Sequence, residues 1–379
     1  MRAGRGYSSS MVTSAIQSAD PTTGKPPRPR RWIPLTLRMY VMMLGVLGVG
    51  SVLWFGFRSY RQFSMIERLE RIDLVEGRPQ KPGFVGLAPN GPGWLRSQIG
   101  DHLMKALDSP RRVQLTGPEF GDADLVQLAA FPQLETLELI GTGITDEGLK
   151  ALRTLGGLKS LHIERAAITD AGMIHIGGLV TLDRLELNSA QITDAGLVQL
   201  EGLSSLRFLA LRDARVTDAG LQYLKVLASL SCIDLEGTAV TGAGLEELSG
   251  LAGVWCLVLS NTQVTDAGLA SLQKMTSLEG LRLGNTHVTD EGLTYLRELT
   301  SLRRLWLDGT QVTDEGLQHL EGLSGLMQLR LDNTQVTDAG LVHLRKLTVL
   351  RSLGRANTKI SEAGISDLQR ALPGLMIVE

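Results

Sequence analysis

The sequence has little cysteine and little net charge. Two cysteines among 379 residues exclude a fold held together by a disulfide framework. The formal net charge of -2 conceals two regions of opposite sign. Residues 1–109 carry 15 Lys and Arg against 7 Asp and Glu, whereas residues 110–379 carry 23 against 33. The second region is therefore net acidic and repels phosphate backbones, so we expect no nucleic-acid partner.

Long hydrophobic runs are also missing, except at residues 39–57, a run of 19 uncharged residues between Arg38 and Arg58. This length is enough to cross a bilayer as a helix. The residues after the run are too bulky for a typical signal-peptidase site, which favours an uncleaved signal anchor at 33–58; a cleaved signal peptide is the alternative. The short basic tail, residues 1–32, is predicted to be disordered and to stay inside the cell. The rest of the chain would then lie outside the cytoplasm, anchored by a single span.

The region after this anchor contains two further predicted segments. Residues 59–93 read as a helical stalk followed by a linker rich in proline and glycine. Residues 94–109 show apolar side chains at helical spacing and are predicted to form an amphipathic helix. Because a solenoid has an open apolar end at its first repeat, we expect this helix to cap that end.

One short phrase recurs every 24 residues through the remainder of the chain. It has five positions in a fixed order. The first is a hydroxyl residue, the second is usually an acid, the third is any residue, the fourth is glycine and the fifth is apolar. Ten copies begin at positions 145 to 361, and a degraded eleventh copy begins at Gly121. A fixed period in the twenties is the signature of a leucine-rich-repeat solenoid. We therefore predict an α/β solenoid, a horseshoe of about 11 repeats over residues 110–379.

The residues of one repeat predict its local structure. Leu305 and Leu307 alternate with polar residues and indicate a short strand with both leucines facing inward. Thr313 is placed to N-cap a helix, and the glycine that follows, Gly316, lowers helix propensity by about 1 kcal/mol relative to alanine. Its recurrence predicts close packing between neighbouring helices. Because parallel strands stack more closely than helices, the sheet should line the concave face and the helices the convex face.

These repeats, for example residues 326–341, resemble those of bacterial leucine-rich-repeat proteins with ribonuclease-inhibitor-like shape. The segments 30–38 and 92–96 further resemble membrane-anchored leucine-rich-repeat proteins of planctomycetes. Such a resemblance implies protein binding. The repeats are also similar to those of F-box ubiquitin-ligase adaptors, but the chain contains no F-box, which removes that role.

Catalytic and cofactor motifs are not recognisable. The glycines belong to the repeat and form no phosphate-binding loop, and the residues between the anchor and the repeats are too few for a catalytic domain. His175, His319 and His343 share one repeat position, but on helices about 10 Å apart they are too distant to share a metal ion. We therefore predict no enzymatic activity, no cofactor and no metal site.

The two cysteines occupy the same outward-facing strand position of neighbouring repeats. Cys232 and Cys256 should lie side by side at about 4.8 Å, within the Cα range of a disulfide. Parallel Cβ vectors on adjacent strands aim the sulfurs poorly, however, so two free thiols are expected.

The outward-facing strand positions also predict a binding surface. Arg282, Trp306 and Arg330 should lie on three adjacent strands, and tryptophan and arginine are enriched at binding hot spots. The predicted protein-binding residues are Arg282, Arg304, Trp306, Asp308, Gln328, Arg330 and Asp332. We expect an acidic segment of a protein partner to dock there. Two alternatives stay open, a structural envelope protein that self-associates and a non-enzymatic cell-surface sensor.

Overall fold

The computed structural model describes residues 84–88, 109–188 and 191–378, all within one compact unit, Arg58–Glu379. These residues form a 13-stranded sheet in which the strands follow one another in sequence order. The first two strands are antiparallel, and every later pair is parallel. The strands are β1 (Phe84–Ala88), β2 (Ser109–Thr116), β3 (Thr136–Ile140), β4 (Ser160–Glu164), β5 (Arg184–Asn188), β6 (Phe208–Ala210), β7 (Cys232–Asp234), β8 (Cys256–Val258), β9 (Gly280–Arg282), β10 (Arg304–Trp306), β11 (Gln328–Arg330), β12 (Ser352–Gly354) and β13 (Met376–Val378).

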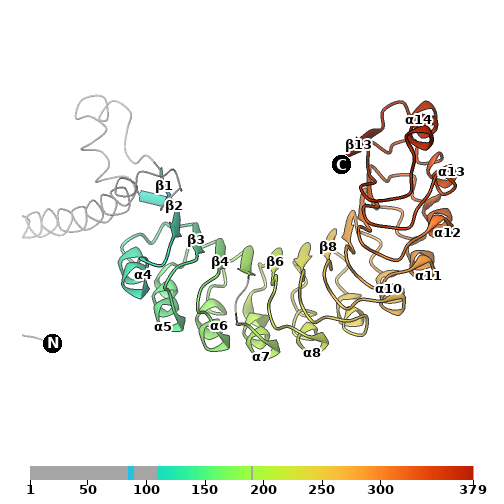
Figure 1. Ribbon diagram of the computed structural model, residues 1–379. Helices are drawn as coiled ribbons and strands as arrows, with labels where there is room; N and C mark the ends of the chain where they lie inside the picture. The colour runs from blue at the N-terminus through green and yellow to red at the C-terminus, as the bar shows by residue number, and fades with distance from the viewer. Residues whose placement is uncertain (1–83, 89–108, 189–190, 379) are drawn as a thin grey trace, which may run out of the picture. The chain divides into compact units, whose positions relative to one another are not determined.

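A short helix follows nearly every strand and returns the chain to the next one. The α-helices are α4 (Asp122–Leu128), α5 (Asp146–Leu149), α6 (Asp170–Ile176), α7 (Asp194–Leu197), α8 (Asp218–Leu221), α9 (Leu245–Leu248), α10 (Asp266–Leu272), α11 (Asp290–Leu293), α12 (Asp314–Leu317), α13 (Leu341–Leu344) and α14 (Glu362–Ala371). Four of them continue as 3-10 turns: η2 (Lys150–Thr154), η3 (Val198–Gly202), η4 (Thr294–Leu296) and η5 (Gln318–Leu320). Within the repeat array the strands lie on the inner side of the curve and the helices on the outer side, as predicted (Figure 1).

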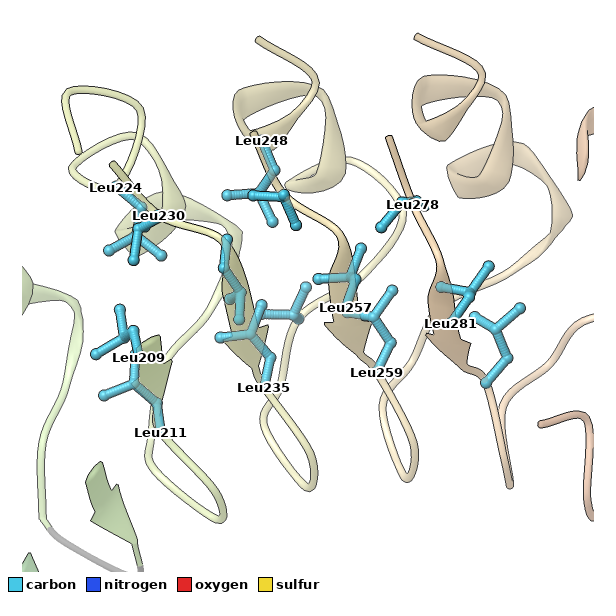
Figure 2. Close-up of a cluster of buried hydrophobic side chains, with 14 of the residues drawn as sticks. Leu209, Leu211, Leu224, Leu230, Leu235, Leu248, Leu257, Leu259, Leu278 and Leu281 are labelled. Carbon is cyan, nitrogen blue, oxygen red and sulfur yellow. The ribbon is translucent and has the colours of Figure 1, made fainter. Parts of the chain in front are cut away.

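The core is a stack of leucine layers between the sheet and the helices. In one repeat Leu305 and Leu307 point inward from the strand, and Leu317 and Leu320 meet them from the helix; all four are fully buried. Figure 2 shows the same arrangement in the middle repeats, where Leu209 and Leu211 face Leu224 and Leu230. Fully burying one such side chain contributes about 1.5–3 kcal/mol, so every repeat adds to one continuous core.

The acidic residue of the repeated phrase forms a ladder between repeats. In the pair Asp290–Thr313, the backbone N–H of Thr313 donates to Asp290 Oδ1 at 2.8 Å and its hydroxyl donates to Oδ2 at 2.6 Å. The same two hydrogen bonds recur in the pairs Asp122–Thr145, Asp146–Thr169, Asp170–Thr193, Asp194–Thr217, Asp218–Thr241, Asp266–Thr289, Asp314–Thr337 and Asp338–Ser361. In the last pair the Ser361 hydroxyl and then its backbone N–H lower the pKa of the Asp338 carboxyl. We name this series the Asp–Thr ladder.

The recurring glycine makes room for this ladder. A Cβ atom on Gly316 would lie 2.3 Å from Asp290 Oδ1 and 3.1 Å from a methyl group of Leu293. The predicted close packing between helices is therefore confirmed, and the group that requires the glycine is the carboxylate of the preceding repeat.

The ladder is interrupted once within the described repeats. Gly242 takes the aspartate position and has no carboxylate to offer Thr265. The turn before α9 and the first turn of α10 come into backbone contact here, because a Cβ atom on Gly242 would lie 2.5 Å from the Cα of Gly268. Glycine-to-glycine backbone contact thus replaces the ionic hydrogen bonds at this boundary.

The segment before the repeats differs from the prediction. Residues 84–88, within the predicted linker, form strand β1, which pairs with the outer edge of β2. Strand β2 begins at Ser109, the last residue assigned to the predicted capping helix; the remainder of 94–109 and residues 33–58 lie outside the described residues. In the part of the chain that the structure describes, no helix is long and apolar enough to span a membrane.

Candidate functional site

The strand register brings the predicted binding residues together on the sheet face. Trp306 is paired with Arg282 on one side and with Arg330 on the other. Two residues earlier in the strands, Arg304 is paired with Gln328. Asp308 and Asp332 follow β10 and β11. We name this group of seven residues the Arg–Trp patch. The predicted placement of Arg282, Trp306 and Arg330 on three adjacent strands is confirmed, whereas Asp332 is buried.

Trp306 and Arg282 form the centre of the Arg–Trp patch. The guanidinium carbon of Arg282 lies 4.5 Å from the centroid of the Trp306 ring, a cation–π contact. Trp306 is half-buried, whereas Arg282 and Arg304 are exposed. Among the described residues, neither of these two arginines makes a salt bridge. They therefore present two positive charges, neither of them held in a salt bridge, beside a partly exposed aromatic ring.

Arg330 is different, because its charge is already compensated. Its Nε and terminal nitrogen both lie 2.8 Å from Asp332 Oδ2. The Asp332 side chain is 5% exposed, against 48% for Arg330, and its other oxygen accepts a 2.7 Å hydrogen bond from the backbone N–H of Ala356. Arg330 thus neutralises a buried carboxylate and is less available to a partner than the sequence suggested.

Two glycines beside the patch make room for two carboxylates that belong to the patch. A Cβ atom on Gly284 would lie 2.6 Å from Asp308 Oδ2, and one on Gly354 would lie 2.7 Å from Asp332 Oδ2. Both spaces accommodate an aspartate. A Cβ on Gly280, in contrast, would meet nothing within 4 Å, so open space on the sheet face remains only at this one of the three glycines.

A second arginine–aromatic pair was not predicted. Arg184 lies over the ring of Phe208, 3.6 Å from its centroid, and its Nε donates to Glu186 at 2.7 Å. Nearby, Arg212 forms a salt bridge with Asp234, whose side chain is 3% exposed. The sequence could have predicted the pair of Arg184 and Phe208, because they are 24 residues apart and therefore occupy the same position of neighbouring strands. Both arginines have carboxylate partners, unlike Arg282 and Arg304.

In the acidic half of the sheet face, basic side chains also neutralise part of the negative charge. Glu164 contacts Arg165 at 3.1 Å and His162 at 3.6 Å. Glu138 and Glu186 flank His162 in the strand register. No group of three or more metal-binding side chains is present in the described residues.

The three histidines at one repeat position make separate contacts. His319 touches Arg297, and burial followed by this arginine lowers the pKa of His319. His343 lies 2.8 Å from Glu321 Oε1. Burial, then Arg153, lowers the pKa of His175. Each histidine thus has its own charged neighbour, and His343 also acts through space on His319.

Cys232 and Cys256 are both free, as predicted, and occupy paired positions on β7 and β8. Cys232 is buried and Cys256 half-buried. The row continues on the sheet face from Phe208 through the two cysteines to Gly280 and Arg304. Charged side chains lie near the pair: Asp234 acts through space on both thiols, and Arg282 acts on Cys256.

Comparison with known proteins agrees with this architecture. Residues 132–152 match the family model described as "Leucine Rich repeat". Among solved structures, the chain is similar to an internalin, InlF, from Listeria monocytogenes, with 21% identity, 70% of this chain and 86% of that chain covered, and a TM-score of 0.52. It also matches internalin C2 from Listeria monocytogenes, with 25% identity, 63% of this chain and 84% of that chain covered, and a TM-score of 0.40. A third match is the leucine-rich-repeat protein LIC12759 from Leptospira interrogans, with 17% identity, 67% of this chain and 80% of that chain covered, and a TM-score of 0.40. Among curated proteins, none matches the sequence. The similarity to InlF shows the leucine-rich-repeat fold.

Proposed function

We propose that this chain, a leucine-rich-repeat protein, binds another protein through its sheet face and receives an acidic segment of that partner on the Arg–Trp patch. One observation carries the proposal. Trp306 is partly exposed, it lies beside Arg282 on the next strand and two residues after Arg304, and neither arginine makes a salt bridge among the described residues. A carboxylate of a partner supplies the missing charge, and the indole ring supplies apolar contact area.

The position of the patch in the sheet supports the same function. Three neighbouring strands fix the spacing of the residues through their backbone pairing, so no backbone has to be ordered when a partner binds. Strands β9 to β11 are short, three residues each, and the glycine at position 280 leaves space beside Arg304. An extended acidic segment therefore fits better than a bulky, basic one.

Trp306→Ala and Arg304→Glu should each weaken partner binding at least tenfold, or about 1.4 kcal/mol. Neither side chain is fully buried, so the thermal midpoint should stay within about 1–2 °C of the wild-type value. Proximity labelling in native membranes identifies the partner, and a binding titration with the purified partner measures the dissociation constant.

Arg345→Glu is the matched control, because it makes the same charge change just after helix α13, at an exposed position on the helix side. It should leave binding unchanged. If Trp306→Ala and Arg304→Glu both bind normally, the Arg–Trp patch is not the site. The acidic half of the sheet face, around Glu138, Glu164 and Glu186, then becomes the candidate.

We further propose that residues 33–58 anchor the chain in a membrane, with the repeats outside the cytoplasm. The uncharged run at 39–57 supports this proposal. Full-length protein should stay in the membrane fraction after a carbonate wash, and its N-terminal peptides should be found by mass spectrometry. A mature N-terminus near residue 59 would instead identify a cleaved signal peptide.

A further inference from the structure

The two cysteines lie side by side on the sheet face, and the proposed protein binding does not use them. Cys232 and Cys256 are Cα partners on adjacent parallel strands, so their side chains leave the sheet in the same direction. Both are free thiols. Adjacent parallel strands are separated by about 4.8 Å.

Cys256 is the more accessible member of this pair. It is half-buried, whereas Cys232 is 6% exposed. The strand neighbour of Cys256 is Gly280, which has no side chain to cover the sulfur, and a Cβ atom placed on it would meet nothing within 4 Å. A small ion therefore reaches the pair at Cys256, with Cys232 deeper in the surface.

Positive charge lies near the outer sulfur. Arg282 and Arg304 both act through space on Cys256.

We propose that Cys232 and Cys256 together bind one soft monovalent cation, Cu(I), between their sulfurs. Two metal–thiolate bonds of about 2.3 Å each, the zinc–thiolate length, span about 4.6 Å when placed end to end, close to the strand separation. A direct S–S bond of about 2.05 Å requires the two parallel Cβ atoms to move together. Thiolates select Cu(I) among the common soft ions. Zn²⁺ prefers four ligands, and no third metal-binding side chain joins the pair among the described residues.

The binding step is a ligand exchange without oxidation. Two S–Cu bonds form, and each thiol that was protonated releases its proton to water, so binding strengthens as pH rises. The resulting bis-thiolate complex carries one negative charge. Arg282 and Arg304, which act on Cys256 through space, offset that charge.

The test is a titration of reduced, full-length protein with Cu(I) under anaerobic conditions, against a competing Cu(I) chelator. One Cu(I) should bind per chain and protect both thiols from alkylation. Cys232→Ser and Cys256→Ser should each bind at least about a hundredfold more weakly, because the second ligand no longer acts at high effective concentration. Met327→Leu, which removes an exposed thioether just before strand β11, is the control and should bind normally.

Three results would overturn the proposal. The first is binding that survives both serine substitutions, and the second is alkylation of both cysteines while Cu(I) is bound. The third combines two observations: mild oxidation lowers the mass of the protein by two hydrogens, and the reduced protein binds no Cu(I). Together they would identify the cysteines as a disulfide pair. If a serine variant does not fold, the alkylation of wild-type protein with and without Cu(I) still decides. The outcome is independent of partner binding, since Trp306→Ala keeps both thiols.

Discussion

Replacing Gly316 with alanine should lower the free energy of unfolding by about 1–3 kcal/mol, the usual range for overpacking. The added methyl group would lie 2.3 Å from Asp290 Oδ1, so the carboxylate must leave Thr313 or helices α11 and α12 must separate. Alanine is the better helix former by about 1 kcal/mol, and this gain is too small to offset the clash. Urea unfolding followed by circular dichroism measures the difference.

A double-mutant cycle identifies the cause. Asp290→Ala alone removes both acceptors of Thr313 and should destabilise by a similar amount, about 1–3 kcal/mol. In the double variant the carboxylate that clashes is absent. The double variant should therefore lose less unfolding free energy than the sum of the losses in the two single variants. Gly322→Ala is the control, because a Cβ there meets nothing within 4 Å. Full additivity would show that Gly316 is required for another reason.

Arg330→Glu should lower the free energy of unfolding by about 2–4 kcal/mol, less than the 3–5 typical of a fully buried pair because Arg330 is half exposed. The substitution removes both contacts to Asp332 and places a second carboxylate beside it. Asp332 is almost completely buried and cannot recover these interactions from water. The thermal midpoint and hydrogen exchange of β11 and β12 measure the effect.

Arg304→Glu makes the same charge reversal on the neighbouring strand and serves as the control. Arg304 is exposed and forms no salt bridge within the described repeats, so stability should be unchanged. Equal loss of stability in both variants would mean that the net charge of the sheet face matters more than the Arg330–Asp332 pair. This contrast also explains why Arg304, rather than Arg330, is the informative position for partner binding.

Most of the fold could be predicted because the 24-residue period fixes which residues become strand neighbours. Once Leu305 and Leu307 were assigned to a strand, the pairing of Trp306 with Arg282 and Arg330 followed by counting. Strand β1 could not be predicted in this way, since it lies before the first repeat and its residues stand in a stretch rich in proline and glycine.

The charge state of the candidate site was harder to predict than its position. Sequence spacing places Asp332 two residues after Arg330, but it does not show that the carboxylate turns inward to accept the backbone N–H of Ala356. The same applies to the aspartates of the Asp–Thr ladder. Sequence spacing places Asp314 in the first turn of its own helix, but it does not show that the carboxylate accepts two hydrogen bonds from Thr337 of the next repeat.

The gap in the Asp–Thr ladder at Gly242 affects how the array behaves as a linear chain of coupled units. In such a chain, cooperativity depends on the coupling free energy between neighbours rather than on the stability of each repeat. At every boundary that has the aspartate, two charge-assisted hydrogen bonds connect the neighbouring repeats. At the boundary between α9 and α10, backbone contact takes the place of these hydrogen bonds. The array therefore consists of two strongly coupled blocks joined at one weaker junction. That junction lies at β8, where Cys256 faces β7, so local opening of the solenoid and exposure of the thiol pair share one location.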